Sequence, residues 1–209
     1  MTTNVTIQAD IIDIASDSPQ QQDIFLVDTN VWLWQTYSKC IPSNTRVQQK
    51  INFYTSYLRK ARLAGSMLTY SGLALAELAH VIEKTEYEIY KANNRVTLKP
   101  KEYRHNHPAE RAKVAREVAL AWEQVKRLAV PVNLTIDDEV TSASLERFKT
   151  QALDGYDLLT LEAISRADPG QVKVITDDID YVAVPGIQMF TKNGGALICA
   201  RNQGKLLVR

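Results

Sequence analysis

Short apolar runs of strand length, separated by longer amphipathic segments, constrain the fold of this chain more than any other feature. Ile24–Val27 is continuously apolar and stops at Asp28. Such a run is typical of a strand that is buried on both faces of a parallel sheet. Further strands are expected at Val5–Ile14, Met67–Tyr70, Val172–Thr176 and Ile187–Phe190.

The segments between these runs have the spacing of amphipathic helices. In Ala109–Leu128, apolar side chains recur at helical intervals. Ser71 is a good N-cap for a helix that reaches about Ala92. Other helices are expected at Thr45–Ala64, from Asp137 or Asp138 to Lys149, and at Asp154–Ala167. Because strands alternate with helices, the sequence predicts an α/β fold with a mostly parallel sheet.

The length of 209 residues favours one domain with additions over two independent domains. We expect residues 1–22 to form an N-terminal extension, in which a short strand or an ordered tail precedes a polar linker. Residues 23–209 would then form the main domain. Residues 91–108 resemble an insertion in that domain, because the segment is polar, basic and broken by Pro100 and Pro108.

Composition excludes several classes of protein. The chain is 45% hydrophobic, which is enough to bury a core and excludes wholesale disorder. No apolar run approaches the roughly 18–20 residues of a membrane span, and Met1–Gln22 lacks the features of a secretory signal. Cys40 and Cys199 are isolated in sequence and predict neither a disulfide framework nor a paired metal knuckle. We therefore expect a cytoplasmic protein.

The net charge of +1 conceals a segregation of charge along the chain. Residues 91–134 carry a net charge of +6, whereas residues 135–184 carry −7. An acidic block beside a basic one suits a site that uses carboxylates and also meets a polyanion. Solvated helix faces explain the same pattern equally well.

Acidic residues follow two of the expected strands directly. Asp28 comes after Ile24–Val27, and Asp177, Asp178 and Asp180 come after Val172–Thr176. Ligands of open parallel sheets bind beyond the carboxyl ends of the strands, so we expect these carboxylates to converge at one edge. The alternatives are an N-cap role for Asp28 and a simple Asp-rich turn at the second position.

Two further acids lie on expected helices. Glu77 borders an apolar stripe, where a carboxylate is costly to desolvate unless it is paired or bound to metal. The alternative is an exposed Glu77, or one paired with His80. Asp157 stands three residues after Asp154, which is the spacing of a capping box. Asp157 is therefore a helix cap, a metal ligand, or both.

A set of carboxylates without cysteine or an obligatory histidine suits Mg²⁺ or Mn²⁺ better than Zn²⁺. Such ions activate water and stabilise the leaving oxygen of a phosphodiester. We therefore expect phosphodiester hydrolysis as the chemistry of this set, with the basic segments binding the backbone of the substrate.

The order and context of these residues resemble those of the PIN-domain nuclease family. The matching stretches are Phe25–Trp32, Ser71–Leu78 with Glu77, Asp157–Ala163 and Thr176–Tyr181. In that family an Asp follows the first strand, a Glu lies on a central helix and an Asp opens a later helix. A Thr-x-Asp-x-Asp-aromatic turn follows the fourth strand. The match extends from about Ile24 to Asn193.

The resemblance implies a PIN-like three-layer α/β/α fold and Mg²⁺- or Mn²⁺-dependent cleavage of single-stranded or structured RNA. The catalytic metal-site acids would be Asp28, Glu77, Asp157 and Asp178. Asp180 would be an auxiliary ligand or orienter, and Asn30 and Thr176 would position the acids. Many prokaryotic members are toxins of the VapC kind, so the resemblance also implies an antitoxin partner and a homodimer. Residues 1–22 and 91–108 exceed a compact toxin, and we expect a partner surface or an RNA-binding arm there.

Two other functions are compatible with the same residues. A phosphatase with an aspartyl nucleophile would also use an Asp at the end of a strand, but that chemistry needs a second acid two residues later, where this chain has Asn30. A non-catalytic module that binds nucleic acid or protein would retain the sheet and the acids without hydrolysis.

Overall fold

The computed structural model describes residues 6–40, 44–167 and 172–209, and the strands within them form one sheet. The strand order is β4-β3-β2-β5-β6-β1-β7, and all neighbouring strands pair in parallel. The strands are β1 (Asp10–Asp13), β2 (Ile24–Val27), β3 (Met67–Tyr70), β4 (Val130–Pro131), β5 (Val172–Ile175), β6 (Ile187–Thr191) and β7 (Leu206–Leu207). The expected α/β fold with a mostly parallel sheet is confirmed.

The expected helices are present, with ends that differ by a few residues. The α-helices are α1 (Thr29–Thr36), α2 (Thr45–Leu63), α3 (Ala74–Asn94), α4 (Pro100–Asn106), α5 (Pro108–Leu128), α6 (Asp138–Phe148), α7 (Gly155–Ala167) and α8 (Gly194–Asn202). Two 3-10 helices are η1 (Ser38–Cys40) and η2 (Ile179–Ala183). Helix α8 was not expected, because it begins with two glycines of low helix propensity. Its start is stabilised by Asn193, whose side chain accepts hydrogen bonds from two backbone N–H groups.

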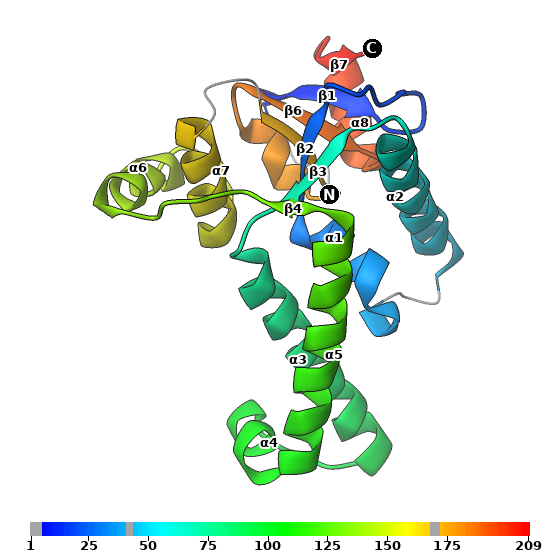
Figure 1. Ribbon diagram of the computed structural model, residues 1–209, viewed down its shortest axis with the longest axis vertical. Coiled ribbons are helices and arrows are strands. Elements are labelled where there is room, and N and C mark those ends of the chain that lie inside the picture. Colours follow the sequence, from blue (N-terminus) through cyan, green and yellow to red (C-terminus); the bar gives the residue numbers. More distant parts are fainter. Residues whose placement is uncertain (1–5, 41–43, 168–171) are drawn as a thin grey trace.

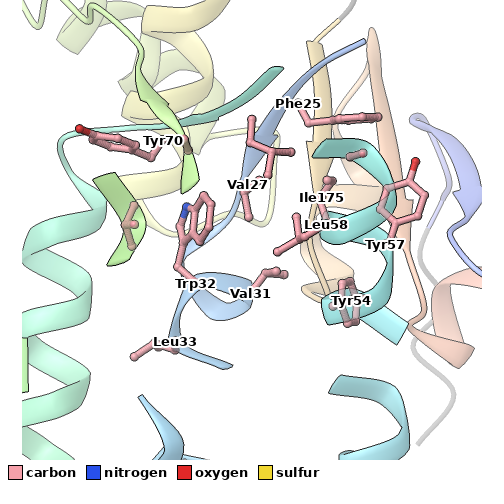
Figure 2. Packing of buried hydrophobic residues seen from close by; sticks show 14 of the residues in the cluster. Phe25, Val27, Val31, Trp32, Leu33, Tyr54, Tyr57, Leu58, Tyr70 and Ile175 are labelled. Carbon is pink, nitrogen blue, oxygen red and sulfur yellow. The ribbon is translucent and has the colours of Figure 1, made fainter. Parts of the chain in front are cut away.

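Both faces of the sheet are covered, as the apolar strands predict. Phe25 and Val27 of β2 contribute to a core with α1, α2, α3 and α5 (Figure 2). Leu26, between them, contributes to a second core on the opposite face with α7, α8 and η2. Because successive side chains of a strand point to opposite faces, one apolar run serves both cores. The fold therefore has helical layers on both sides of the sheet.

The helices α3 and α5 pack along each other and project from the sheet as an arm, with α4 at its far end (Figure 1). Residues 91–108, expected to be an insertion broken by prolines, form the end of α3, a short connection and α4. Pro100 and Pro108 are the first residues of α4 and α5 and do not break helices. Proline suits this position because its missing N–H would have no intrahelical partner there.

A buried carboxylate on α3 forms ion pairs with η1 and with α5 and so connects the arm to the elements beside the sheet. The side chain of Glu86 on α3 is fully buried and forms ion pairs with Lys39 of η1 and Lys113 of α5. Burial alone would raise the pKa of Glu86, but hydrogen bonds from Lys113, Lys39 and Tyr37 lower it to about 2. The charged form is therefore the stable one in the folded protein.

The N-terminal segment belongs to the sheet. Strand β1 lies between β6 and β7, and its Ile11 and Ile12 are buried on opposite faces. The segment after β1 is held by Arg209, whose guanidinium group donates to the buried carboxylates of Asp17 and Asp23 over distances of 2.9 to 3.0 Å. Val5, the first residue of the expected Val5–Ile14 strand, lies outside the described residues. The observed strand is shorter and spans Asp10–Asp13.

Within the described residues, no helix has both the length and the apolar character needed to cross a lipid bilayer. Cys199 on α8 is a free thiol of intermediate exposure. The side chain of Cys40 lies outside the described part of the chain.

Candidate functional site

The candidate site lies where the direction of the chain across the sheet reverses. From β2 the chain proceeds outward to β3 and β4, whereas β5 lies on the other side of β2 and is followed outward by β6. In open parallel sheets, the carboxyl ends of the strands at such a reversal are the usual place for a ligand. The pairing of Val27 with Ile175 makes Asp28 and Thr176 the next residues along the two strands. Both therefore enter the crevice between β2 and β5.

The hydroxyl group of Thr176 connects three of the expected site residues. Thr176 is fully buried, and its Oγ1 donates to Oδ2 of Asp28 over 2.5 Å. The same oxygen accepts hydrogen bonds from the backbone N–H of Asp178 at 2.9 Å and from Nδ2 of Asn30 at 3.3 Å. The turn after β5 is thus fixed against the turn after β2, and Asp28 and Asp178 lie on the same side of the molecule.

Two helices bring the remaining expected acids to this crevice. Glu77 lies in the first turn of α3, and its carboxylate accepts a hydrogen bond from the Thr29 hydroxyl. Asp157 lies in the first turn of α7, and its Oδ1 accepts from the buried Tyr181 hydroxyl at 2.5 Å. The positive end of a helix dipole favours carboxylates at these positions. Thr29 and Tyr181 lie within the matching stretches Phe25–Trp32 and Thr176–Tyr181, but their roles as hydrogen-bond donors to the acids were not predicted from the sequence.

Carboxylate oxygens of Glu77, Asp154 and Asp157 all lie within 4.8 Å of one another. Asp154 was expected only as a helix cap. The structure confirms the cap, because Oδ1 of Asp154 accepts from the N–H groups of Tyr156 and Asp157. It also adds a carboxylate to the acidic group. The spacing that makes Asp154 a cap for the helix of Asp157 also keeps the two acids together, and this was the available signal.

Burial and mutual repulsion raise the pKa values of these acids. The pKa of Asp28 is raised to about 7, chiefly by burial and further by the charges of Glu77 and Asp178. The pKa of Asp157 is raised to about 8 by burial and by the charge of Asp28. The pKa of Glu77 is also raised, first by burial and then by Asp154. Across the described ranges, no Lys or Arg forms an ion pair with any of these acids.

The other acids of the Asp-rich turn are arranged differently. The carboxylate of Asp177 turns away from the acidic group, forming an ion pair with Lys50 and accepting a hydrogen bond from Tyr54 at 2.9 Å. Asp180 is exposed, and its backbone N–H donates to Oδ1 of Asp178 at 2.9 Å. Burial and the charge of Asp178 raise the pKa of Asp180. Asp178 and Asp180 thus flank the group formed by Glu77, Asp154 and Asp157 but are not part of it.

The chemistry of the donors fits a divalent cation. The group offers carboxylate oxygens with no sulfur or imidazole, which are the ligands of Mg²⁺ and Mn²⁺. In addition, Oδ1 of Asn30 is buried and has no hydrogen-bond partner among the described residues. Asp28, Glu77, Asp154 and Asp157 are the side chains best placed to hold such an ion, because their raised pKa values or mutual proximity call for a nearby positive charge.

An open groove leads from the acids along the arm. It has a volume of about 840 Å³ and lies between α3 and α5, with Glu77 and Asp154 in its lining and Arg111 farther along. Its remaining lining is mostly apolar and includes Val114 and Trp122. The acidic group is therefore accessible from the surface of the arm.

Comparison of the sequence with protein-family models finds no match, and comparison with curated proteins finds none either. Among solved structures, the fold is similar to a chain in the structure of VapBC2 from Rickettsia felis bound to a DNA fragment from their promoter. The TM-score is 0.41 at 13% sequence identity, and the alignment covers 80% of this chain and 98% of that chain. A likeness at this level is weak and says nothing of the chemistry of this chain.

Proposed function

We propose that the protein is a divalent-metal-dependent endoribonuclease of the PIN type. The observation that carries this proposal is the convergence of Asp28, Glu77 and Asp157 at the strand reversal, with raised pKa values and without a basic partner among the described residues. A protein gains no stability from such an arrangement unless a cation neutralises it. The resemblance of the surrounding motifs to those of PIN nucleases supports the same chemistry.

In this proposal the acids bind metal and the neutral donors orient them. Asp28, Glu77, Asp154 and Asp157 are the acids that would hold the metal, with Asp154 added by the geometry to the set expected from the sequence. Asp178, which was expected in that set, and Asp180 flank these acids and would be auxiliary. When bound, Mg²⁺ or Mn²⁺ would lower the pKa of a water molecule and stabilise charge on the phosphodiester. Thr176 and Asn30 hold the end of β2 against the turn after β5.

RNA is the proposed substrate because the acids adjoin a basic arm. Arg95, Lys99 and Lys101 are exposed near the end of the arm, and none of them forms an ion pair in the described part of the chain. Exposed cations of this kind bind a phosphate backbone without sequence preference. The arm would thus bind the RNA backbone outside the acidic centre. This attraction would offset the repulsion between the phosphates of the substrate and the carboxylates of the centre.

Cleavage of a 5′-labelled RNA in Mn²⁺ tests the proposal. We expect cleavage by the wild type, its loss in EDTA, and its loss in Asp28→Asn. A matched control is Asp13→Asn, because Asp13, the last residue of β1, pairs with Lys192 and lies outside the acidic group. Full activity of Asp28→Asn would refute the assignment. Hydrolysis of an aryl phosphate without cleavage of RNA would instead identify the phosphatase alternative.

We also propose that the protein is the toxin of a toxin–antitoxin pair. In this proposal it acts in the cytoplasm and forms a homodimer. The support is the motif resemblance to VapC-type toxins. Expression in a bacterial host should arrest growth, and Asp28→Asn should abolish the arrest. Co-expression of a small protein encoded beside the gene should relieve it. Unimpaired growth with active wild-type enzyme would refute the toxin role while leaving the nuclease proposal intact.

A further inference from the structure

The Asp-rich turn after β5 alternates in direction. The Thr176 hydroxyl donates to Asp28 and the charge of Asp178 acts on Asp28, whereas the carboxylate of Asp177 between them faces α2. If this carboxylate also entered the crevice, it would add a further negative charge to acids that already repel one another. The orientation of Asp177 therefore affects both the geometry and the charge of the candidate metal centre.

The hydroxyl group of Tyr54 on α2 is fixed at the base of this turn. The residue is fully buried, and its Oη lies 2.9 Å from Oδ1 of Asp177 and 3.1 Å from the carbonyl oxygen of Thr176. It also accepts the backbone N–H of Lys192 at 2.8 Å and lies 3.1 Å from Oγ1 of Thr191. A hydroxyl has one proton to donate and two lone pairs, so these neighbours use its full capacity. One side chain thus connects the ends of β5 and β6.

Lys50 completes the contact one helical turn earlier. Residues four apart on a helix share a face, so Lys50 and Tyr54 reach the turn together. The ammonium group of Lys50 pairs with Oδ2 of Asp177 while Tyr54 binds Oδ1. It also lies 5.5 Å from the centre of the Trp34 ring, and its side chain is 30% exposed, so packing restricts its position. Both oxygens of Asp177 therefore have a partner on α2.

We propose that Lys50, Tyr54 and Asp177, here called the α2 brace, position the Thr176–Asp178 turn and thereby set the affinity of the centre for a divalent cation. The brace itself rests on hydrogen bonds and an ion pair, and its effect on metal rests on the proposed function. Lys50 and Tyr54 are positioning residues, because they contact the turn and not the acids of the centre. Without them, the Asp177 carboxylate is free to turn toward the crevice, and the carbonyl oxygen of Thr176 loses the Tyr54 donor. The turn keeps the backbone contacts of the Thr176 N–H with Phe190 and of the Asp177 carbonyl with Asn193.

Tyr54→Phe and a matched control separate positioning from general stability. The control is Tyr57→Phe, because Tyr57 is also a buried tyrosine of α2 (Figure 2). Its hydroxyl likewise donates to a carboxylate, that of Asp17. Its carboxylate partner lies outside the Asp-rich turn. Both variants should melt at lower temperature than the wild type. Only Tyr54→Phe should weaken Mn²⁺ binding in calorimetric titration, by about tenfold, the lower end of the loss expected when an outer contact that orients metal ligands is removed.

A second pair of variants tests the charge of Asp177. Lys50→Met should weaken Mn²⁺ binding through the position of the turn, because the Asp177 carboxylate loses the ion pair that holds it on α2. The loss of a nearby positive charge would by itself strengthen binding of a cation, so weaker binding identifies a positioning effect. Adding Asp177→Asn to Lys50→Met should restore most of the affinity, because a neutral amide needs no cation to stay on α2 and its oxygen still accepts the hydrogen bond from Tyr54. A double variant as weak as Lys50→Met would contradict this part of the proposal.

Hydrogen exchange of the metal-free protein tests the brace without metal. The amide of Asp178 donates to Thr176, so peptides covering residues 176–181 should exchange faster in Tyr54→Phe and not in Tyr57→Phe. Unchanged exchange in Tyr54→Phe, or equal effects of both variants on Mn²⁺ affinity, would overturn the brace. Failure of the wild type to bind Mn²⁺, with the exchange difference present, would instead overturn the proposed function and the metal role of the brace.

Discussion

Replacement of Asp28 by Asn should stabilise the metal-free protein while abolishing its activity. The side chain of Asp28 does not cap α1, so Asn removes no capping hydrogen bond. The Asn side-chain oxygen can still accept the hydrogen bond that Thr176 donates to Asp28. What the substitution removes is a buried negative charge beside Glu77 and Asp178. Its effect on stability therefore depends on the ionisation of Asp28.

The size of this effect follows from the pKa of Asp28, which rises from an ordinary value of 3.8 to about 7 on folding. Below pH 3.8 both states hold the proton, and between the two values only the folded state does. The folded state is therefore progressively destabilised as the pH rises through this range, and the full penalty is present above pH 7. At about 1.4 kcal/mol for each pKa unit, the maximum is about 4 kcal/mol. Because Asp157 has a pKa of about 8 and remains partly protonated at pH 8, we expect a gain of about 2–4 kcal/mol in Asp28→Asn there.

Urea unfolding in EDTA at pH 5, 6, 7 and 8 measures this difference. The gain in the free energy of unfolding should grow from pH 5 to pH 7 and then level. Asp13→Asn, which removes an acid paired with Lys192, should show no gain at any of these pH values. Mn²⁺ at ten times its dissociation constant should stabilise the wild type by about 1.4 kcal/mol and Asp28→Asn by much less. An Asp28→Asn variant that is less stable than the wild type at pH 8 would refute the reasoning, because Asp28 would then be compensated in the folded protein.

Other substitutions separate the acidic group from the structural ion pairs. Asp154→Asn should keep the stability of α7, because Asn caps equally well, but should weaken Mn²⁺ binding several-fold in calorimetry. Glu86→Gln should lower the free energy of unfolding by about 3 kcal/mol at pH 7, because the pKa of Glu86 falls from 4.5 to about 2 on folding; the difference should disappear as the pH falls from 4.5 toward 2. Arg209→Ala should lower it by about 3–5 kcal/mol in chemical denaturation, because Asp17 and Asp23 remain buried without their shared partner. An unchanged unfolding midpoint in either of the last two variants would contradict the assigned ion pair.

The sequence predicted the architecture because its determinants are local. The run Ile24–Val27 is apolar at every position, and a strand with this property must be covered on both sides. The acid that ends the run then lies at the carboxyl end of the strand, whatever the rest of the chain does. The same reasoning placed the Asp-rich turn after the expected strand Val172–Thr176, which ends at Ile175 in the structure.

Local patterns failed where a short or weakly periodic segment depended on its neighbours. The edge strands β4 and β7 are two residues each, and they exist because β3 and β1 offer them hydrogen bonds. Residues 91–108 appeared as a polar insertion, but Tyr103 of α4 is buried against Tyr87 and Tyr90 of α3. Their aromatic contacts join segments whose individual patterns are too short to indicate a helical arm.

For this protein, the sequence alone determined that acidic side chains would follow buried parallel strands and open helices, because hydrophobic runs and capping residues act over a few neighbouring positions. Only the tertiary structure decided which of those acids share one crevice. Asp154 lies beside Glu77 because α7 begins next to the start of α3. Asp177 points away from these acids because Lys50 and Tyr54 of α2 bind its carboxylate. The direction of a carboxylate is set by donors and cations that approach from distant parts of the chain, and no local pattern encodes their approach.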